Sequence, residues 1–179
     1  MQKKIFKANL SSKSIEQLQK DLEKYNANLA NKCKELSQKL AEKGINVAKA
    51  KISDSPLGKY ILIKVDLIPE QTGCKAILIA TGAVKQSENF APFNTLLAVE
   101  FGAGIHYNSK ANPNADKFGL GVGTFPGQVH AFEDGWYYWN EEAQEWQYTH
   151  GVKATMPMYN AYIEIIQNVV KTAKEVFRD

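Results

Sequence analysis

The chain has 179 residues, of which 44% are hydrophobic and 23% are charged, as in a typical soluble globular domain. A chain of this length buries enough surface to fold without a metal or a disulfide framework. Its two cysteines, Cys33 and Cys74, lack CxxC or CxxH spacing, so we expect two reduced thiols. No apolar run resembles a secretory signal or a membrane span, so we expect a cytoplasmic product with no membrane partner.

Charge is distributed unevenly along the chain. The net charge is +3, but residues 1–51 contain twelve lysines and five acids, whereas the remainder contains ten basic and fourteen acidic residues. A basic segment can face nucleic acid or an acidic partner. Arg178 is the only arginine, although recognition of bases and phosphates relies on arginine. A solvated helix face is therefore the plainer interpretation.

Residues 14–43 have the pattern of a long amphipathic helix. Ser14 and Gln17 resemble a capping box, and Gly44 is placed to end the helix. Its length of about 45 Å exceeds the width of a small domain. Its apolar stripe therefore either lies across the chain's own sheet or extends to another subunit. The stripe, with spacings of three and four residues, consists of Ile15, Leu18, Leu22, Tyr25, Leu29, Cys33, Leu36 and Leu40.

The pattern changes to a period of two after Gly44. We expect antiparallel strands at residues 45–52, 60–68 and 75–80, separated by the turn sequences SDSPLG and PEQTG. Residues 87–93 read as a connection. The run TLLAVEF that begins at Thr95 allows a strand or a short helix, and we expect a strand.

Glycine and proline dominate residues 102–129, which contain six glycines. They predict a long irregular loop, of the kind that binds something or is ordered only in an assembly. The sequence DGWYYWNEEAQEWQYTHG then predicts a hairpin of two aromatic strands around a turn at residues 140–144. Five acidic residues lie in or beside this hairpin and could bind the basic helix: Glu133, Asp134, Glu141, Glu142 and Glu145.

The chain ends in a second predicted helix, from about Met156, with Thr155 as its N-cap and Pro157 in its first turn. Together these elements predict a single α+β domain over residues 1–179. It combines a long N-terminal helix, a small mostly antiparallel sheet, a Gly-rich loop, an aromatic hairpin and a C-terminal helix. The stripe of the last helix consists of Tyr159, Tyr162, Ile163, Ile166, Val170, Ala173 and Phe177.

No catalytic signature stands out. The three histidines, His106, His130 and His150, have neither HExxH nor finger-like spacing, so we expect no metal site. GxSxG is missing. The stretch FGLGVGTFPG lacks the Lys-Ser/Thr of a phosphate loop and the strand and helix that a dinucleotide fingerprint requires. We therefore expect no enzyme, no catalytic residues and no cofactor.

The tryptophans of the hairpin allow two interpretations. An aromatic platform binds sugars or quaternary ammonium groups, and GWYYWN resembles one unit of the choline-binding repeats. Such modules work as arrays, whereas this chain has one copy. Packing of one hairpin face on the core and one on a partner is the preferred interpretation. The alternative is a sugar- or choline-binding module of a phage lysis or host-recognition protein. The aromatic residues are Trp136, Tyr137, Tyr138, Trp139, Trp146 and Tyr148.

Two separated segments, LLAVEFGAGI at residues 96–105 and THGVKATMPMYNAY at residues 149–162, carry a resemblance. In this order they resemble the head–tail connector and tail-completion (neck) family of long-tailed phages and prophages. That family has a VEFGTG segment before a variable loop and a G-x-x-A-x-P-F-M-Y-N segment at the start of its last helix. Ala103 replaces the Thr of the first motif, and Pro157 lacks the usual Phe after it. The matching residues are 99–104, Gly151, Ala154, Pro157, Met158, Tyr159 and Asn160, with a GW element at Gly135 and Trp136.

The resemblance implies a structural, non-enzymatic virion protein at the phage neck, made in the host bacterial cytoplasm. Several copies of such a protein form a homo-oligomeric ring between the portal or adaptor and the tail proteins, and the ring helps to join tail to head. DNA passes through such a ring without sequence-specific binding. For the ring contact we hypothesise that the acidic hairpin of one subunit meets the basic helix face of the next.

Overall fold

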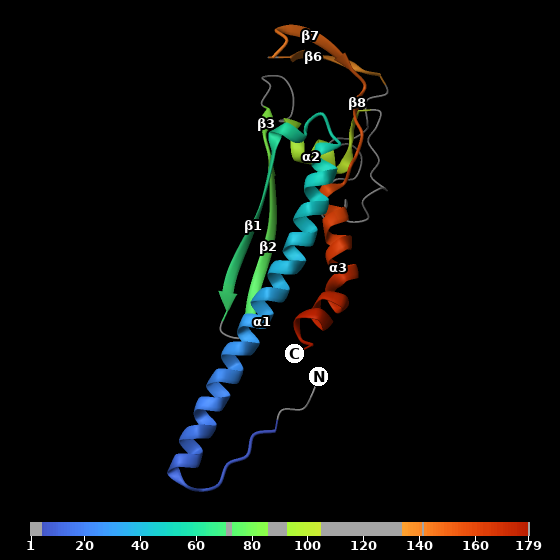
Figure 1. The fold of residues 1–179 in the computed structure, drawn as a ribbon. Helices are drawn as coiled ribbons and strands as arrows, with labels where there is room; N and C mark the ends of the chain where they lie inside the picture. Colours follow the sequence, from blue (N-terminus) through green and yellow to red (C-terminus); the bar gives the residue numbers. More distant parts are fainter. Residues whose placement is uncertain (1–4, 71–72, 86–92, 105–133, 141, 179) are drawn as a thin grey trace.

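The computed structural model describes residues 5–70, 73–85, 93–104, 134–140 and 142–178. Within the described residues the strands pair as separate two-stranded antiparallel ladders and accompany two long helices, so the predicted α+β class is confirmed (Figure 1). The elements are α1 (Ser12–Ser53), η1 (Gly58–Tyr60), β1 (Ile61–Glu70), β2 (Gly73–Gly82), β3 (Val84–Lys85), β4 (Phe93–Asn94), α2 (Thr95–Phe101), β5 (Ala103–Gly104), β6 (Trp136–Asn140), β7 (Glu145–Thr149), β8 (Gly151–Val152) and α3 (Pro157–Val176).

Helix α1 is longer than predicted at its C-terminal end. It does not stop at Gly44 but continues to Ser53, so both the predicted helix end and the predicted strand at residues 45–52 are wrong. Gly44 is buried inside the helix, where a Cβ atom would lie 2.6 Å from Cδ1 of Ile165 in α3. The glycine therefore permits a close helix crossing rather than a helix end. At its other end α1 is capped by Ser11, whose hydroxyl accepts the N–H of Ser14 at 3.3 Å.

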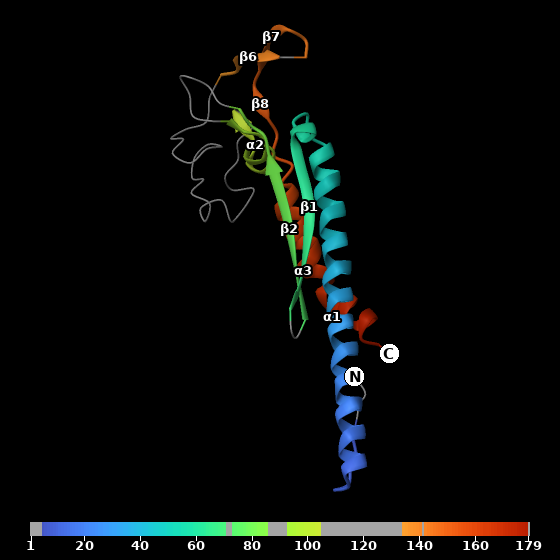
Figure 2. The same ribbon diagram turned by 90° about the vertical axis from the view of Figure 1, so that its left-hand side faces the viewer.

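The C-terminal half of α1 packs against both the β1–β2 hairpin and α3 (Figures 1 and 2). The tip of the β1–β2 hairpin reaches α1 near Cys33, because the Ser37 hydroxyl donates to the carbonyl of Cys74 at 2.9 Å. A Cβ atom on Gly73 would lie 3.9 Å from Cβ of Cys33. Residues 12–32 of α1 extend beyond this tip (Figure 1).

Strands β1 and β2 confirm the strands predicted at residues 60–68 and 75–80 and extend them. Their register runs from Ile61 opposite Gly82 to Glu70 opposite Gly73. Side chains alternate as expected for a sheet with one covered face. Ile61 is buried, whereas its neighbour Leu62 is 75% exposed.

The hydrophobic core lies where α1, β1 and α2 meet, around Ile52, Ile61 and Val99. The prediction of a strand at residues 95–101 is wrong, because these residues form α2. The side chain of Asn94 caps this helix by accepting the N–H groups of Leu96 and Leu97 at 3.0 and 3.3 Å. Most of the predicted connection at 87–93, and the predicted loop beyond residue 104, lie outside the described residues.

The predicted hairpin and C-terminal helix are confirmed as β6–β7 and α3. The N-cap position of α3 is Met156 rather than Thr155, and Pro157 is its first residue. The predicted stripe of α3 is partly wrong, since three of its members point away from α1. They are Tyr162, Ile166 and Val170, which are 53%, 51% and 64% exposed. The buried face instead carries Pro157, Ala161, Thr172 and Val176.

Candidate functional site

The two segments that carry the resemblance meet in the structure, although 43 residues separate them in the sequence. The carbonyl of Val99 accepts the N–H groups of Thr155 and Met156 at 2.9 and 3.3 Å. Four residues after Val99 and three residues before Thr155, β5 pairs with β8, with Ala103 opposite Val152. We call this unit, residues 99–104 and 151–160, the segment junction.

Glu100 lies at the centre of the segment junction and is 6% exposed. Its carboxylate accepts the backbone N–H groups of Met158 and Tyr159 at 2.9 and 3.0 Å. The first N–H groups of a helix have no partner within the helix, and the helix dipole favours a negative charge there. Glu100, a residue of α2, therefore caps α3. The start of the helix in the second segment thus depends on a residue of the first segment.

Two further residues fix the backbone of the segment junction. The Asn160 amide donates to the carbonyl oxygens of Thr155 and Met156 at 3.2 and 2.7 Å, which holds Met156 in a left-handed conformation with φ of 51°. Gly151 has φ of 117°, and a Cβ atom there would overlap the carbonyl oxygen of Ala103. Only glycine allows this approach of β8 to β5.

The β6–β7 hairpin presents four aromatic rings on one face. The cross-strand pair Tyr137 and Tyr148 has ring centroids 5.0 Å apart, and the pair Trp139 and Trp146 has centroids 5.7 Å apart, both edge to face. These side chains are between 42% and 66% exposed. We call these four residues the aromatic face.

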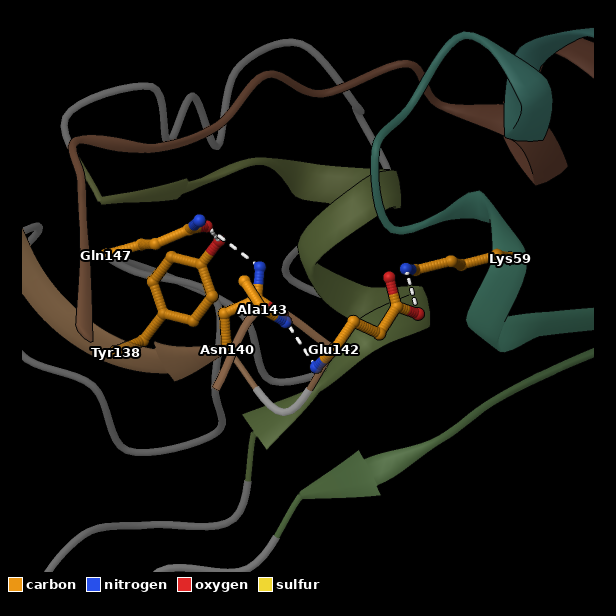
Figure 3. A network of polar contacts seen from close by, with 6 residues as sticks. All are labelled: Lys59, Tyr138, Asn140, Glu142, Ala143 and Gln147. Carbon is orange, nitrogen blue, oxygen red and sulfur yellow. Dashed lines mark hydrogen bonds and ion pairs between the residues drawn. The ribbon is translucent and has the colours of Figure 1, made fainter. Parts of the chain in front are cut away.

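Described side chains on the opposite face of the hairpin form polar contacts. The Tyr138 hydroxyl and the Asn140 amide both donate to Oε1 of Gln147 at 2.9 Å (Figure 3). None of the described side chains of β6 and β7 is buried. The expectation that one hairpin face packs on the core is therefore wrong for those side chains. The side chain of Trp136 lies outside those that the structure describes.

An ion pair connects the hairpin turn to the corner between α1 and β1. Lys59 of η1 lies 2.6 Å from the carboxylate of Glu142 (Figure 3). The hydrogen bond from Lys59 lowers the pKa of Glu142, and the same bond raises the pKa of Lys59. Asn140 shapes the turn, since its side-chain oxygen accepts the N–H groups of Glu142 and Ala143 at 3.0 and 3.2 Å.

The structure describes one of the three histidines. His150 contacts the ring of Tyr148, with centroids 5.1 Å apart, whereas His106 and His130 lie outside the described residues. Within the described ranges, no group of three or more His, Cys, Asp or Glu side chains is placed to hold a metal ion. Cys33 and Cys74 are half-buried, and neither forms a disulfide.

A depression of about 500 Å³ lies at the corner of α1 and β1. Lysine and serine side chains such as Lys49, Ser53 and Lys59 line it, without any carboxylate, histidine or cysteine. In the part of the chain that the structure describes, no helix has the length and apolarity that a membrane span requires.

Sequence reasoning missed the roles of Glu100 and Lys59. A signal for Glu100 existed, because a single carboxylate inside the apolar run TLLAVEF needs a partner when that run is buried. Lys59 carried no such signal. The chain has no significant match among protein-family models, curated proteins or solved structures.

Proposed function

We propose that this protein is a structural, non-enzymatic virion component at the phage head–tail junction, assembling as a ring that helps to join tail to head. The segment junction is the observation that carries the proposal. Both segments of the neck resemblance form one unit, in which Glu100, Gly151 and Asn160 make structural contacts. These residues position α3 and the hairpin, as expected of motifs that preserve a shape rather than a reaction.

The distribution of exposed apolar groups also supports an assembly role. Residues 12–32 of α1 extend away from the core at one end, and the β6–β7 hairpin, which carries the exposed aromatic face, lies at the other end (Figure 1). Exposed apolar groups of this kind mark contact surfaces. The proposed neighbours are further copies of the chain, the portal or adaptor, and tail proteins.

Electron microscopy of a lysate from a phage that lacks this gene tests the proposal. We expect separate filled heads and finished tails, with joined particles restored by the wild-type gene in trans. A Gln167→Asp copy, altered at an exposed position of α3, is the matched control and restores joining equally well. Normal particles without the gene would refute the neck role.

The aromatic face favours one second candidate, a module that binds sugar or choline. Four exposed rings on one hairpin face provide the π-surfaces that quaternary ammonium groups contact. Titration with choline separates the candidates through tryptophan fluorescence. A binding module gives a saturable change that Trp146→Ala removes and Tyr162→Ala retains, whereas a neck protein gives no response.

A further inference from the structure

The apolar stripe of α1 is covered along only part of its length. In the C-terminal half, Ala41, Ala48 and Ile52 are buried under the β1–β2 hairpin and α3. In residues 12–32 the stripe continues at the same helical spacing, but Ile15 is 51% and Leu22 is 41% exposed. Tyr25 is 36% exposed, and Phe6 covers one edge of it, with ring centroids 5.7 Å apart. We call Ile15, Leu22 and Tyr25 the outer α1 stripe.

Helix α3 has a second apolar face beside the face that it packs on α1. Val169 is 38% exposed and lies on one side of the helix with the more exposed Tyr162, Ile166 and Val170. These four residues, spaced by four, three and one, form a continuous strip along the helix. We call them the outer α3 stripe.

The two outer stripes match in length and continue an existing contact. At about 1.5 Å per residue, the outer α1 stripe from Ile15 to Tyr25 spans about 15 Å, and the outer α3 stripe from Tyr162 to Val170 spans about 12 Å. Within one chain α3 already packs along the C-terminal half of α1, and the stripe of α1 runs on past the end of that contact. A second α3 placed against residues 12–32 would repeat this type of helix pairing.

The charges beside the stripes are compatible with this pairing. The exposed residues next to the outer α1 stripe carry both signs of charge, with Asp21 and Glu23 beside Lys24. The C-terminal half of α3 carries the exposed cations Lys171 and Lys174. The acids of α1 thus have cations available on α3 when the two stripes pack together.

We propose that the outer α1 stripe of one copy packs on the outer α3 stripe of a second copy. Because two different surfaces meet, the contact is heterologous. Each copy binds one neighbour through its outer α1 stripe and a second neighbour through its outer α3 stripe. Repetition of such a contact closes a ring when the rotation between copies permits it. The inference rests on the proposed ring and names the surfaces that form it.

Single charges placed in each stripe test the contact. Leu22→Asp blocks the outer α1 stripe, and Val170→Asp blocks the outer α3 stripe. Ala27→Asp and Gln167→Asp make the same charge change at exposed positions on other sides of the same helices. By analytical ultracentrifugation, each stripe variant should self-associate at least about tenfold more weakly than the wild type, with both controls unchanged. Circular dichroism verifies that the helices are retained.

Mixing the two blocked variants distinguishes this contact from the alternatives. Val170→Asp keeps a working outer α1 stripe and Leu22→Asp keeps a working outer α3 stripe, so together they form one contact and stop. An equimolar mixture should give a species of twice the 20.0 kDa chain mass and nothing larger. A monomeric mixture, a wild type that stays monomeric, or a Val170→Asp variant that assembles normally would overturn the proposal. The phage deletion remains independent, since it tests the neck role and not this contact.

Discussion

Glu100 shows how one buried carboxylate links two distant parts of the chain. Its carboxylate oxygens accept backbone N–H groups at the start of α3, so its charge is compensated by two donors and by the helix dipole. Thr155, which the sequence suggests as the cap, instead donates its backbone N–H to Val99. The start of α3 therefore depends on α2 rather than on its own residues.

Replacing Glu100 with Gln should lower the free energy of unfolding by about 1–3 kcal/mol, because one carboxylate oxygen becomes an amide that faces an N–H donor. Urea denaturation measures the loss, and hydrogen exchange at Met158 and Tyr159 should quicken. Glu175→Gln, at an exposed position of α3, is the control and should change stability by less than about 0.5 kcal/mol. Equal stability of the two variants would contradict the capping role.

Gly44 gives a second prediction at this scale. Alanine favours helix over glycine by about 1 kcal/mol, but here its Cβ would lie 2.6 Å from Cδ1 of Ile165. In the wild type, Gly44→Ala should therefore raise the free energy of unfolding only slightly or lower it. In an Ile165→Val background, which lacks the Cδ1 atom, the same substitution should raise the free energy of unfolding. Thermal unfolding of the four proteins in this double-mutant cycle measures the coupling. Strict additivity would show that α3 does not approach α1 at Gly44.

At the scale of elements, the sequence predicts what local patterns control. Three- and four-residue spacing identified α1 and α3, and alternation between turn sequences identified β1, β2 and the β6–β7 hairpin. A glycine such as Gly44 is typical of a helix end and so favours a strand at residues 45–52, although Ala48 and Ile52 keep a helical spacing. A continuous apolar run such as α2 has no period that separates helix from strand. Asn94, a favoured N-cap residue directly before this run, is the sequence signal that favours a helix over a strand.

The candidate site was less predictable, because its contacts join residues that are far apart in the sequence. Nothing local to Glu100 indicates the start of α3, and nothing local to Lys59 indicates Glu142 across 83 residues. The outward face of α3 was missed for a related reason. Its apolar arc is wider than one contact needs, and the spacing alone does not say which part faces α1.

The hairpin position should depend on pH through the pair of Lys59 and Glu142. The lowered pKa of Glu142 means that the pair stabilises the fold at neutral pH and that this contribution is lost as pH falls through that pKa. The raised pKa of Lys59 means that the contribution is also lost as pH rises through it. Both side chains are at least half exposed, so the effect is small.

Lys59→Met should move the pKa of Glu142 up toward its ordinary value of 4.5, with Lys85 still lowering it slightly. Carboxyl NMR titration measures the shift directly. Lys75→Met removes the same charge from an exposed position on β2 and should leave the titration of Glu142 unchanged. An identical titration in Lys59→Met and wild type would show that the hairpin is not held by this pair.

At the scale of the whole molecule, charge and shape are polarised along the same axis. The extended half of α1 lies at one end and the β6–β7 hairpin at the other (Figure 1). The helix end belongs to the basic part of the chain, and the hairpin sequence from Glu133 to Thr149 contains five acids and no lysine or arginine. Such a molecule is suited to contacts between unlike ends, as a ring of identical subunits requires.

The hypothesis that the acidic hairpin meets the basic helix face predicts a salt-dependent ring. Reversing Lys32, Lys34 and Lys39 to Glu should weaken the oligomer at low salt and reduce its sensitivity to salt, because fewer opposite charges remain to be screened. Lys39 already pairs with Glu35 at 2.7 Å, so circular dichroism must confirm that the variant keeps its helix.

Sedimentation across a salt series measures this effect, and a second triple reversal provides the control. Lys64, Lys75 and Lys153 are exposed lysines on other parts of the chain, so their reversal to Glu makes the same change in net charge. A contact through the basic helix face should be weakened much more by the first set than by the second. If both sets act alike, net charge alone governs assembly. If the ring is unchanged at low salt in the first variant, the hairpin does not bind this face, and the apolar stripes of α1 and α3 would have to hold the ring without it.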